Sequence, residues 1–578
     1  MAWYDEAIFY HIYPLGLLGA PKENSYSEVT HRLRELDPWI GHIKEIGCNA
    51  LYIGPLFESV GHGYETTDYR KLDSRLGDNE DLKDFVNKCH DNGIRVILDG
   101  VFNHTGRDFF AFKDLKEKRE GSHYRDWYCN VNFYGNNEYN DGFSYDNWGG
   151  YNLLVKLNQK NPEVKGYISE TIRFWVKEFD IDGLRLDTAD VLDFDFMKML
   201  RSIAMEVKSD FWLMGEVIHG DYSRWVNEGT LHSVTNYVMH KAFYSGHNDH
   251  NYYEIAHTQK RLDGMVGNGF KLYNFVDNHD VERIYTKLWN KAHFTPVHIL
   301  LYTMPGIPSI YYGSEFAIEG KKEKMSDASL RPKLNIADYK DAVNSNPATR
   351  LIAALGKVRR ETPELSYGDY KEVYLKNRQY AFSRSYNGRT VFVTVNNDDN
   401  NSVIYLPQGS AQIYMGALSG ERINTNGGGF QVNIKGNSGE IWVPLDEGGV
   451  REPAGEPGTV VQGLTVTQDA QGVMSGNDGT QAHQNGDSGN AESAQPQAAA
   501  AATVAQEETQ GPGAVGAAQA TGNAGEAQGS YADGVIDGLQ EAIIAIMEKN
   551  GPVTDQMRKD VYDNRHHDSL IKWIQSFR

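Results

Sequence analysis

The sequence is poor in cysteine, and this shortage excludes disulfide-stabilised proteins and CxxC metal sites. Its three cysteines, Cys48, Cys89 and Cys129, are scattered through 578 residues, too few and too far apart for either framework. We interpret them as small apolar residues buried in a protein of a reducing compartment. A cytoplasmic protein is therefore expected.

Basic charge and long apolar runs are also scarce. Lys and Arg number 57 against 78 Asp and Glu, which leaves a formal net charge of −21. Clustered Lys and Arg bind nucleic acids and anionic membrane surfaces, so neither is an expected partner. The N-terminal segment MAWYDEAIFYHIYP has no basic start and no continuous apolar run, and no later segment reaches the length of a membrane span. We expect neither a signal peptide nor a transmembrane helix.

Up to about residue 358, the sequence alternates short β-branched runs with longer helical patterns. Eight runs are typical of strands: IFYHIYP, NALYIGP, RVILDG, GLRLD, FWLMGE, HSVTNY, LYNFVDNHD and IPSIYYGSE. Eight parallel strands can close into a (β/α)8 TIM barrel with the helices outside. The chain is too long for a single hydrophobic core, so further domains are expected.

Changes in composition divide the rest of the chain. A loop-rich stretch at 106–158 interrupts the alternation after the third strand, so the barrel is predicted at 1–105 and 159–358. Short alternating strands with Gly and Asn turns over 359–446 predict an antiparallel β-sandwich. The inserted stretch carries aromatic residues that either contact a ligand or pack within a small subdomain; they are Trp127, Tyr134, Tyr145, Trp148 and Tyr151.

Two segments follow the predicted sandwich. Residues 447–530 are dominated by small and polar residues and, from 449 on, contain no Phe, Trp, Tyr or Lys, which predicts a disordered linker. Residues 531–578 regain apolar residues at helical spacing, with a break at Pro552, and are predicted to form a small helical module. Its apolar faces could pack on one another, dock on the rest of the chain or pair with another chain.

Carboxylates stand at the ends of three predicted strands. Asp187 ends DGLRLD, Glu216 ends FWLMGE and Asp280 ends FVDNHD. The carboxyl ends of barrel strands form the active face, so these groups are expected to share one cavity. Two carboxyl groups roughly 5 to 5.5 Å apart can break a glycosidic bond with retention, one as nucleophile and one as acid. A third can hold substrate hydroxyls as charge develops at the sugar.

Polar residues around two of these strands complete the predicted site. Asp99, Asn103 and His104 lie at or just after the end of RVILDG. Arg185 is two residues before Asp187, hence on the same strand face, and could keep that carboxylate ionised. Taken alone, each acidic residue would more often cap a helix or lie charged in a solvated loop. Several polar groups at strand ends together indicate a catalytic site.

These segments resemble the α-amylase superfamily, glycoside hydrolase family 13. DGVFNHTG, DGLRLDTAD, GEV and FVDNHD are similar to its four sequence regions, in the same order. LVKLNQKNPEV resembles its fifth region, and GHGYETTDY resembles its loop with a sugar-stacking tyrosine. The resemblance covers about residues 1 to 446. The lysine in LVKLN is similar to that of neopullulanases, cyclomaltodextrinases and maltogenic amylases.

The resemblance implies a role for each matched residue. Asp187 would be the nucleophile, Glu216 the general acid and base, and Asp280 the stabiliser of the transition state. Arg185 would orient Asp187. The residues implied to contact the sugar at the cleavage point are Tyr64, which would stack on it, and Asp99, His104 and His279, which would hydrogen-bond to it.

Three departures limit what the resemblance implies. After the nucleophile, Thr188–Ala189–Asp190–Val191 replaces the Val-Ala-Asn-Glu that is usual in that group. The resemblance therefore does not imply cleavage of α-1,6 branches. The N-terminal β-domain that builds the dimer of that group has no counterpart before the first predicted strand, so the dimer is not carried over either. Asn103 would match a calcium ligand of secreted α-amylases, but Val191 stands where those enzymes have a second ligand, a histidine. The segment GLLGAPKENS also lacks the acidic DxNxDG pattern that binds calcium in related glucosidases. No metal ligand and no required cofactor are predicted; calcium is allowed but not expected.

The predicted activity is hydrolysis of α-1,4-glucosidic bonds in maltooligosaccharides, cyclodextrins or related α-glucans, through a covalent intermediate on Asp187. Two alternatives stay open. A transglycosylase would pass the same intermediate to another sugar, and a carbohydrate-binding protein would keep the barrel without the chemistry. The intact set of acids argues against the second. Self-association or docking to a partner through 531–578 is a further hypothesis.

Overall fold

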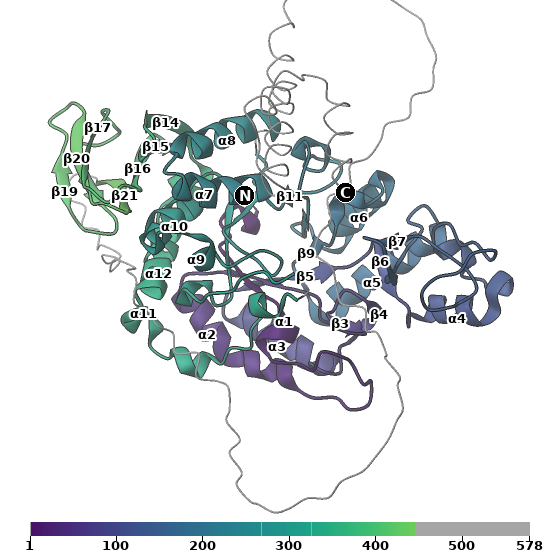
Figure 1. Cartoon of the computed structure of the whole chain (residues 1–578). Helices are drawn as coiled ribbons and strands as arrows, with labels where there is room; N and C mark the ends of the chain where they lie inside the picture. The colour runs from purple at the N-terminus through teal and green to yellow at the C-terminus, as the bar shows by residue number, and fades with distance from the viewer. Residues whose placement is uncertain (1, 268, 325, 446–578) are drawn as a thin grey trace, which may run out of the picture. The chain divides into compact units, whose positions relative to one another are not determined.

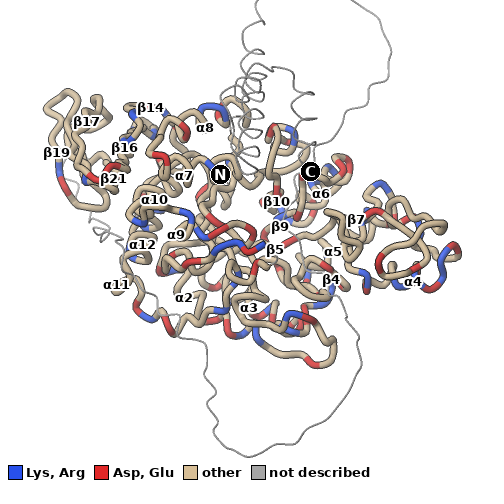
Figure 2. Tube along the Cα trace, viewed as in Figure 1, with Lys and Arg blue, Asp and Glu red and all other residues tan. Residues whose placement is uncertain are grey.

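The computed structural model describes residues 2–267, 269–324 and 326–445 (Figure 1). The predicted linker at 447–530 and the predicted helical module at 531–578 lie outside the described residues. Along the described chain, Lys and Arg are interspersed with Asp and Glu (Figure 2). None of the helices in this part combines the length and the hydropathy needed to cross a bilayer.

A barrel of eight parallel strands forms the centre of the molecule. The strand order is β11-β10-β9-β5-β2-β1-β13-β12, and a parallel bridge between Thr235 and Tyr273 joins the two ends of this sheet. The predicted TIM barrel and all eight predicted strands are thus confirmed. The strands are β1 (Phe9–Ile12), β2 (Ala50–Ile53), β5 (Arg95–Gly100), β9 (Gly183–Leu186), β10 (Trp212–Gly215), β11 (Ser233–Val234), β12 (Tyr273–Phe275) and β13 (Ile307–Tyr311).

Alternate residues of these strands fill the barrel interior. In β10, Trp212 and Met214 belong to the inner cluster, whereas Leu213 belongs to the cluster that includes the outer helices. Phe9 of β1 pairs in register with Ala50 of β2, so a large side chain meets a small one in the same region of the core. This interior is packed with side chains, which leaves the mouth at the carboxyl ends of the strands for polar groups.

Helices surround the barrel, and local sequence signals set where they begin. Asn161 accepts hydrogen bonds from the backbone of the first turn of α5, and Pro162 occupies its first position. Asn346 and Pro347 do the same for α12. The longer helices are α2 (Asp37–Glu45), α3 (Asn79–Asp91), α5 (Pro162–Phe179), α6 (Phe194–Val207), α7 (Tyr237–Asn248), α8 (Tyr252–Met265), α10 (Phe294–Thr303) and α12 (Pro347–Arg360); the short ones are α1 (Pro14–Leu17), α9 (Ile284–Lys287), α11 (Ala342–Ser345) and α13 (Pro363–Tyr367).

The chain between β5 and α5 forms an inserted unit beside the barrel (Figure 1). The predicted loop-rich stretch at 106–158 in fact contains α4 (Phe110–Lys118) and the strands β7 (Asn147–Trp148) and β8 (Tyr151–Lys156). These strands form an antiparallel sheet of order β6-β8-β7 with β6 (His104–Gly106), which begins two residues before the predicted stretch. Trp127 and Tyr145 are buried, whereas Tyr134 is fully exposed. We therefore interpret Trp127 and Tyr145 as residues that pack within the insertion. A separate hairpin, β3 (Phe57–Ser59) and β4 (Thr66–Leu72), follows β2.

The C-terminal part of the described chain is antiparallel, as predicted. Its larger sheet has the order β14-β15-β16-β21-β18-β19, and β17 pairs with β20. Alternate residues from both sheets, such as Phe392, Ile404 and Trp442, form the cluster between them. The strands are β14 (Asp369–Leu375), β15 (Gln379–Tyr386), β16 (Arg389–Asn396), β17 (Ser402–Leu406), β18 (Ile413–Gly416), β19 (Arg422–Asn424), β20 (Phe430–Ile434) and β21 (Ser438–Leu445).

Two helical glycines give a test of the packing around the barrel. A Cβ atom at Gly356 of α12 would lie 2.3 Å from the carbonyl oxygen of Ile46, at the end of α2, whereas one at Gly41 within α2 would meet nothing within 4 Å. We expect Gly356→Ala to lower the free energy of unfolding by about 1–3 kcal/mol, because backbone must move. Gly41→Ala should instead be neutral or stabilising by up to about 1 kcal/mol, because Ala favours the helix. Thermal unfolding of both variants checks this; equal melting temperatures would contradict the close contact.

Candidate active site

Three neighbouring strands carry the centre of the candidate active site. β5, β9 and β10 lie side by side, with Asp99 of β5 in register with Arg185 of β9. Asp187 directly follows β9 and Glu216 directly follows β10. All four side chains are buried. The strand ends therefore bring together these four predicted site residues at the barrel mouth.

Arg185 contacts three carboxylates at once. Its Nη1 atom lies 2.9 Å from Oδ1 of Asp99 and 2.9 Å from Oδ1 of Asp187, and its Nη2 atom lies 2.8 Å from Oε2 of Glu216. Only 3% of the Arg185 side chain is exposed, so water screens these charges little. Asp187 and Glu216 therefore flank a single cation, which keeps the two carboxyl groups close together.

Glu216 is held from two further sides. The backbone N–H of Thr188 donates to Oε2 of Glu216 at 3.0 Å, and the hydroxyl of Tyr237 donates to Oε1 at 3.5 Å. Asn278 in turn donates to the Tyr237 hydroxyl at 3.1 Å. Thr188 has a left-handed backbone (φ 43°), which is rare for a β-branched residue and is strained. This strained turn aims a backbone donor at the carboxylate of Glu216.

Asp280 lies beyond β12 and has its own nitrogen partners. His279 Nε2 lies 3.0 Å from Oδ2 of Asp280, and Nη2 of Arg331 lies 2.8 Å from Oδ1. The side chain of Asp280 is 33% exposed, more than the 7% of Asp187. Asp280 thus stands apart from the Arg185 contacts, with part of its surface open to a ligand.

Tyr64 connects Asp280 with the strand-end acids. Its hydroxyl lies 2.6 Å from Nε2 of His279 and donates to Oδ2 of Asp99 at 3.3 Å. The rings of Tyr64 and His279 are nearly parallel, with centroids 6.0 Å apart. His104 is also buried. Burial and the nearby His62 lower the pKa of His104 to about 3, and a backbone contact with Tyr64 opposes this shift, so His104 is neutral and lies next to Tyr64.

The environments of Asp187 and Asp280 shift their pKa values in opposite directions. Burial raises the pKa of Asp187 well above its ordinary value; Arg185 opposes this shift, whereas Glu216 and Asp99 add to it. Burial also acts to raise the pKa of Asp280, but His279 and Arg331 outweigh it and the pKa lies well below the ordinary value. Asp280 therefore ionises more readily than Asp187, because its own partners stabilise the charged form.

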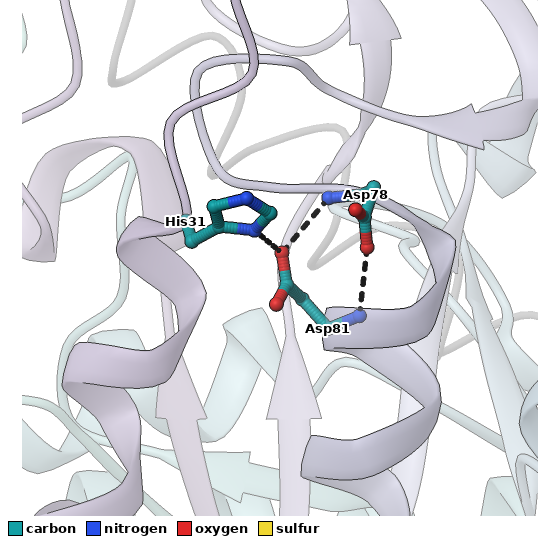
Figure 3. Close-up of side chains that lie close together, drawn as sticks. All are labelled: His31, Asp78 and Asp81. Carbon is teal, nitrogen blue, oxygen red and sulfur yellow. Dashed lines mark hydrogen bonds and ion pairs between the residues drawn. The ribbon is translucent and has the colours of Figure 1, made fainter.

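One group of side chains outside this site has the geometry to hold a metal ion. His31, Asp78 and Asp81 meet at the start of α3 (Figure 3), and it is the single such group in the described part of the chain. Asp81 accepts from His31 and from the backbone of Asp78, and Asp78 accepts from the backbone of Asp81. These atoms form a capping box that satisfies the first turn of α3. We therefore interpret the group as a helix cap.

The structure adds three groups that sequence reasoning missed. They are the backbone N–H of Thr188, the hydroxyl of Tyr237 and the guanidinium group of Arg331. Tyr237 opens α7 and Arg331 lies in the irregular segment after β13. Tyr237 is the last residue of the predicted strand HSVTNY, so its place at a strand end was a signal that could have located it. Arg331 is far from any predicted strand end, and the motif spacing carried no signal for it.

Comparisons with known proteins show which family the chain resembles. A family model described as "Alpha amylase, catalytic domain" matches residues 36–406. A cyclomaltodextrinase of Thermoanaerobacter pseudethanolicus is 31% identical over 427 residues, which are 70% of this chain and 72% of the relative. Neopullulanase 2 of Thermoactinomyces vulgaris is 28% identical over 468 residues, 76% of this chain and 78% of the relative. A solved cyclomaltodextrinase structure superposes with a TM-score of 0.68 at 25% identity, covering 76% of this chain and 78% of the other.

Removing Arg185 tests the charge balance of the site. Arg185→Met would leave buried carboxyl groups without their cation, at a cost of about 3–5 kcal/mol at neutral pH. A buried carboxylate without its cation is destabilised, and the penalty disappears when the carboxyl group takes up a proton, so the cost shrinks as pH falls. We expect the loss in melting temperature relative to the native chain to be larger at pH 7 than at pH 5. Arg173→Met, which breaks an exposed ion pair, is the control; an equal loss at both pH values would contradict the prediction.

Proposed function

The chain belongs to the α-amylase family as a hydrolase of the cyclomaltodextrinase and neopullulanase type, and from this premise we propose that it cleaves α-1,4-glucosidic bonds in maltooligosaccharides and cyclodextrins with retention. The observation that carries the proposal is the contact of Asp187 and Glu216 with the same guanidinium group. It gives two carboxyl groups the proximity that a double displacement needs. The name cyclomaltodextrinase, carried by one of these relatives, specifies a cyclic α-glucan, which supports cyclodextrins as substrates.

In the first step, an oxygen of Asp187 attacks the anomeric carbon while Glu216 gives its proton to the glycosidic oxygen. The bond to the leaving sugar breaks, and a glycosyl ester on Asp187 forms. In the second step, Glu216 takes a proton from water, whose oxygen attacks the same carbon and releases Asp187. Arg185 supports both steps, because its charge stabilises Asp187 whenever that carboxylate is ionised.

The remaining site residues hold the sugar between these carboxylates. We assign Asp280 to hydroxyl binding as positive charge develops at the ring, because its pKa is lowered and part of its surface is exposed. Tyr64 would stack on the sugar, and Asp99, His104 and His279 would hydrogen-bond to it. The set provides acid, nucleophile and charge stabilisation from side chains alone, so the proposed chemistry requires no metal or cofactor.

We further propose a cytoplasmic location. Cys48 and Cys89 are buried free thiols and Cys129 is a half-buried one. Free thiols of this kind suit a reducing compartment.

Replacement of the two carboxyl groups tests the proposal. Asp187→Asn should abolish turnover of maltotriose and of cyclodextrin, because no nucleophile remains, and Glu216→Gln should lower turnover roughly 10²–10⁴-fold. Assays run in EDTA should give the same rates, since no metal takes part. Asp195→Asn, at an exposed ion pair on α6, is the matched control and should keep full activity.

Substantial turnover by Asp187→Asn would refute the assignment of the nucleophile. Chromatography of the products formed from maltotriose distinguishes hydrolysis from transfer. Glucose and maltose are expected, whereas products longer than maltotriose would favour the transglycosylase alternative. A panel with pullulan and starch then defines bond and chain-length preference.

For residues 531–578, which lie outside the described residues, we propose self-association. The supporting pattern is a helical spacing of apolar residues, namely Val535, Ile536, Leu539, Ile543, Ile546 and Met547. A protein truncated after residue 448 should have a smaller oligomer mass by light scattering than the full chain, after correction for the missing residues. An unchanged number of protomers would exclude self-association through this segment.

A further inference from the structure

The geometry points to Arg75 as a built-in cation that takes the place of a structural metal ion and positions the loop that carries Tyr64. Arg75 lies between β4 and α3. Its side chain is 5% exposed, and that of its ion-pair partner Asp73 is fully buried. The part of this inference that concerns Tyr64 rests on the proposed function, whereas the cation site itself does not.

Three segments of the chain meet at this guanidinium group, and each presents oxygen atoms to it. Nε donates to Oδ1 of Asp73 at 2.8 Å, and Nη2 donates to Oδ2 at 2.8 Å. Nη2 also donates to the hydroxyl of Ser59 at 3.0 Å. Nη1 donates to three backbone carbonyl oxygens, those of Pro21 at 2.9 Å, Lys22 at 3.1 Å and Gly61 at 2.7 Å. Each nitrogen of the group therefore has its partners inside the protein.

The oxygen atoms around Arg75 have the chemistry of a calcium site. Calcium ions in proteins are bound by carboxylates and backbone carbonyl groups, and carbonyl groups that converge in the interior need a partner between them. The segment GLLGAPKENS, which includes Pro21 and Lys22, lacks the acidic calcium-binding pattern. A calcium ion does not fit here, because the guanidinium group already lies among these oxygen atoms and pairs with Asp73. The protein's own cation thus fills the site.

This cation site is joined to the loop of the β3–β4 hairpin. Ser59 is the last residue of β3 and Asp73 directly follows β4, so Arg75 contacts both arms of the hairpin. Gly61 lies in the loop between the two strands, three residues before Tyr64. Arg75 therefore ties the loop at its base and along its length, which limits where the ring of Tyr64 can lie.

Asn24 joins the same segments through uncharged contacts. Its side-chain amide donates to the carbonyl oxygen of Ser59 at 3.1 Å and to Oδ1 of Asp73 at 3.2 Å. Its backbone N–H donates to the carbonyl oxygen of Val60 at 2.9 Å. Loss of Arg75 would remove the central charge and leave these bonds in place. We therefore expect the cavity of an Arg75 variant to keep its oxygen lining.

Removal of the guanidinium group should create a site that calcium can fill. Arg75→Ala leaves a buried carboxylate and carbonyl groups without their donor, so its melting temperature should lie roughly 4–8 °C below the native one. Millimolar calcium should recover much of this loss, because it binds the folded form. Magnesium, which keeps its waters and demands octahedral geometry, should recover less. The native chain should melt at the same temperature in calcium and in EDTA.

The same variant tests the connection to Tyr64. At a temperature where Arg75→Ala is folded, kcat/KM for maltotriose should fall roughly 10-fold, because the loop no longer presents the ring in one place. Calcium should restore part of this activity. Arg173→Ala, which removes an exposed ion pair on α5, is the matched control. It should show neither the loss nor a response to calcium.

A native melting temperature in Arg75→Ala would overturn the inference, and so would a lowered one that calcium leaves unchanged, or a native chain that loses stability in EDTA. If Arg75→Ala does not fold, Arg75→Gln decides, since it removes the charge with a smaller change in volume. A melting temperature that calcium raises supports the inference, and an unchanged one refutes it. Turnover by Asp187→Asn would refute the proposed function without affecting these melting temperatures, so the two failures can be distinguished.

Discussion

The rest of the site depends on the contacts of the Arg185 guanidinium group with three buried carboxylates. Asp99, Asp187 and Glu216 come from three adjacent strands and would repel one another without this cation. Burying charges is costly unless they are paired and hydrogen-bonded. The strand order therefore matters as much as the residue types, because only neighbouring strands bring all three acids within reach of one side chain.

A second set of nitrogen partners lets Asp280 behave differently from Asp187. His279 and Arg331 contact Asp280 and not Asp187, whereas Arg185 contacts Asp187 together with Asp99 and Glu216. The same chemical group thus has a lowered pKa at one position and a raised pKa at the other. The two carboxyl groups therefore differ in how readily they ionise, although both lie at the mouth of the same barrel.

The sequence predicted the parts of this molecule that follow a regular pattern. Buried parallel strands appear as apolar runs, and polar residues at their ends stand out, so the eight strands and Asp187, Glu216 and Asp280 could be located. The interior of the insertion was missed: α4 and the sheet of β6, β7 and β8 lie in a stretch whose Gly and Asn content indicated loops. Tyr237 was missed although it ends the predicted strand HSVTNY, whereas Arg331 could not be found, because its contacts join distant parts of the chain and leave no local spacing.

The pairing of β1 with β13 has a consequence for how the protein is made. β1 lies between β2 and β13 in the barrel, yet β1 is the first barrel strand to be synthesised and β13 is the last. Until β13 has left the ribosome, the growing sheet has open edges with unpaired N–H and C=O groups, which attract other strands. The protein cannot complete its barrel in stages. Its period of risk for aggregation therefore lasts through the synthesis of the whole barrel and ends only when the eighth strand arrives.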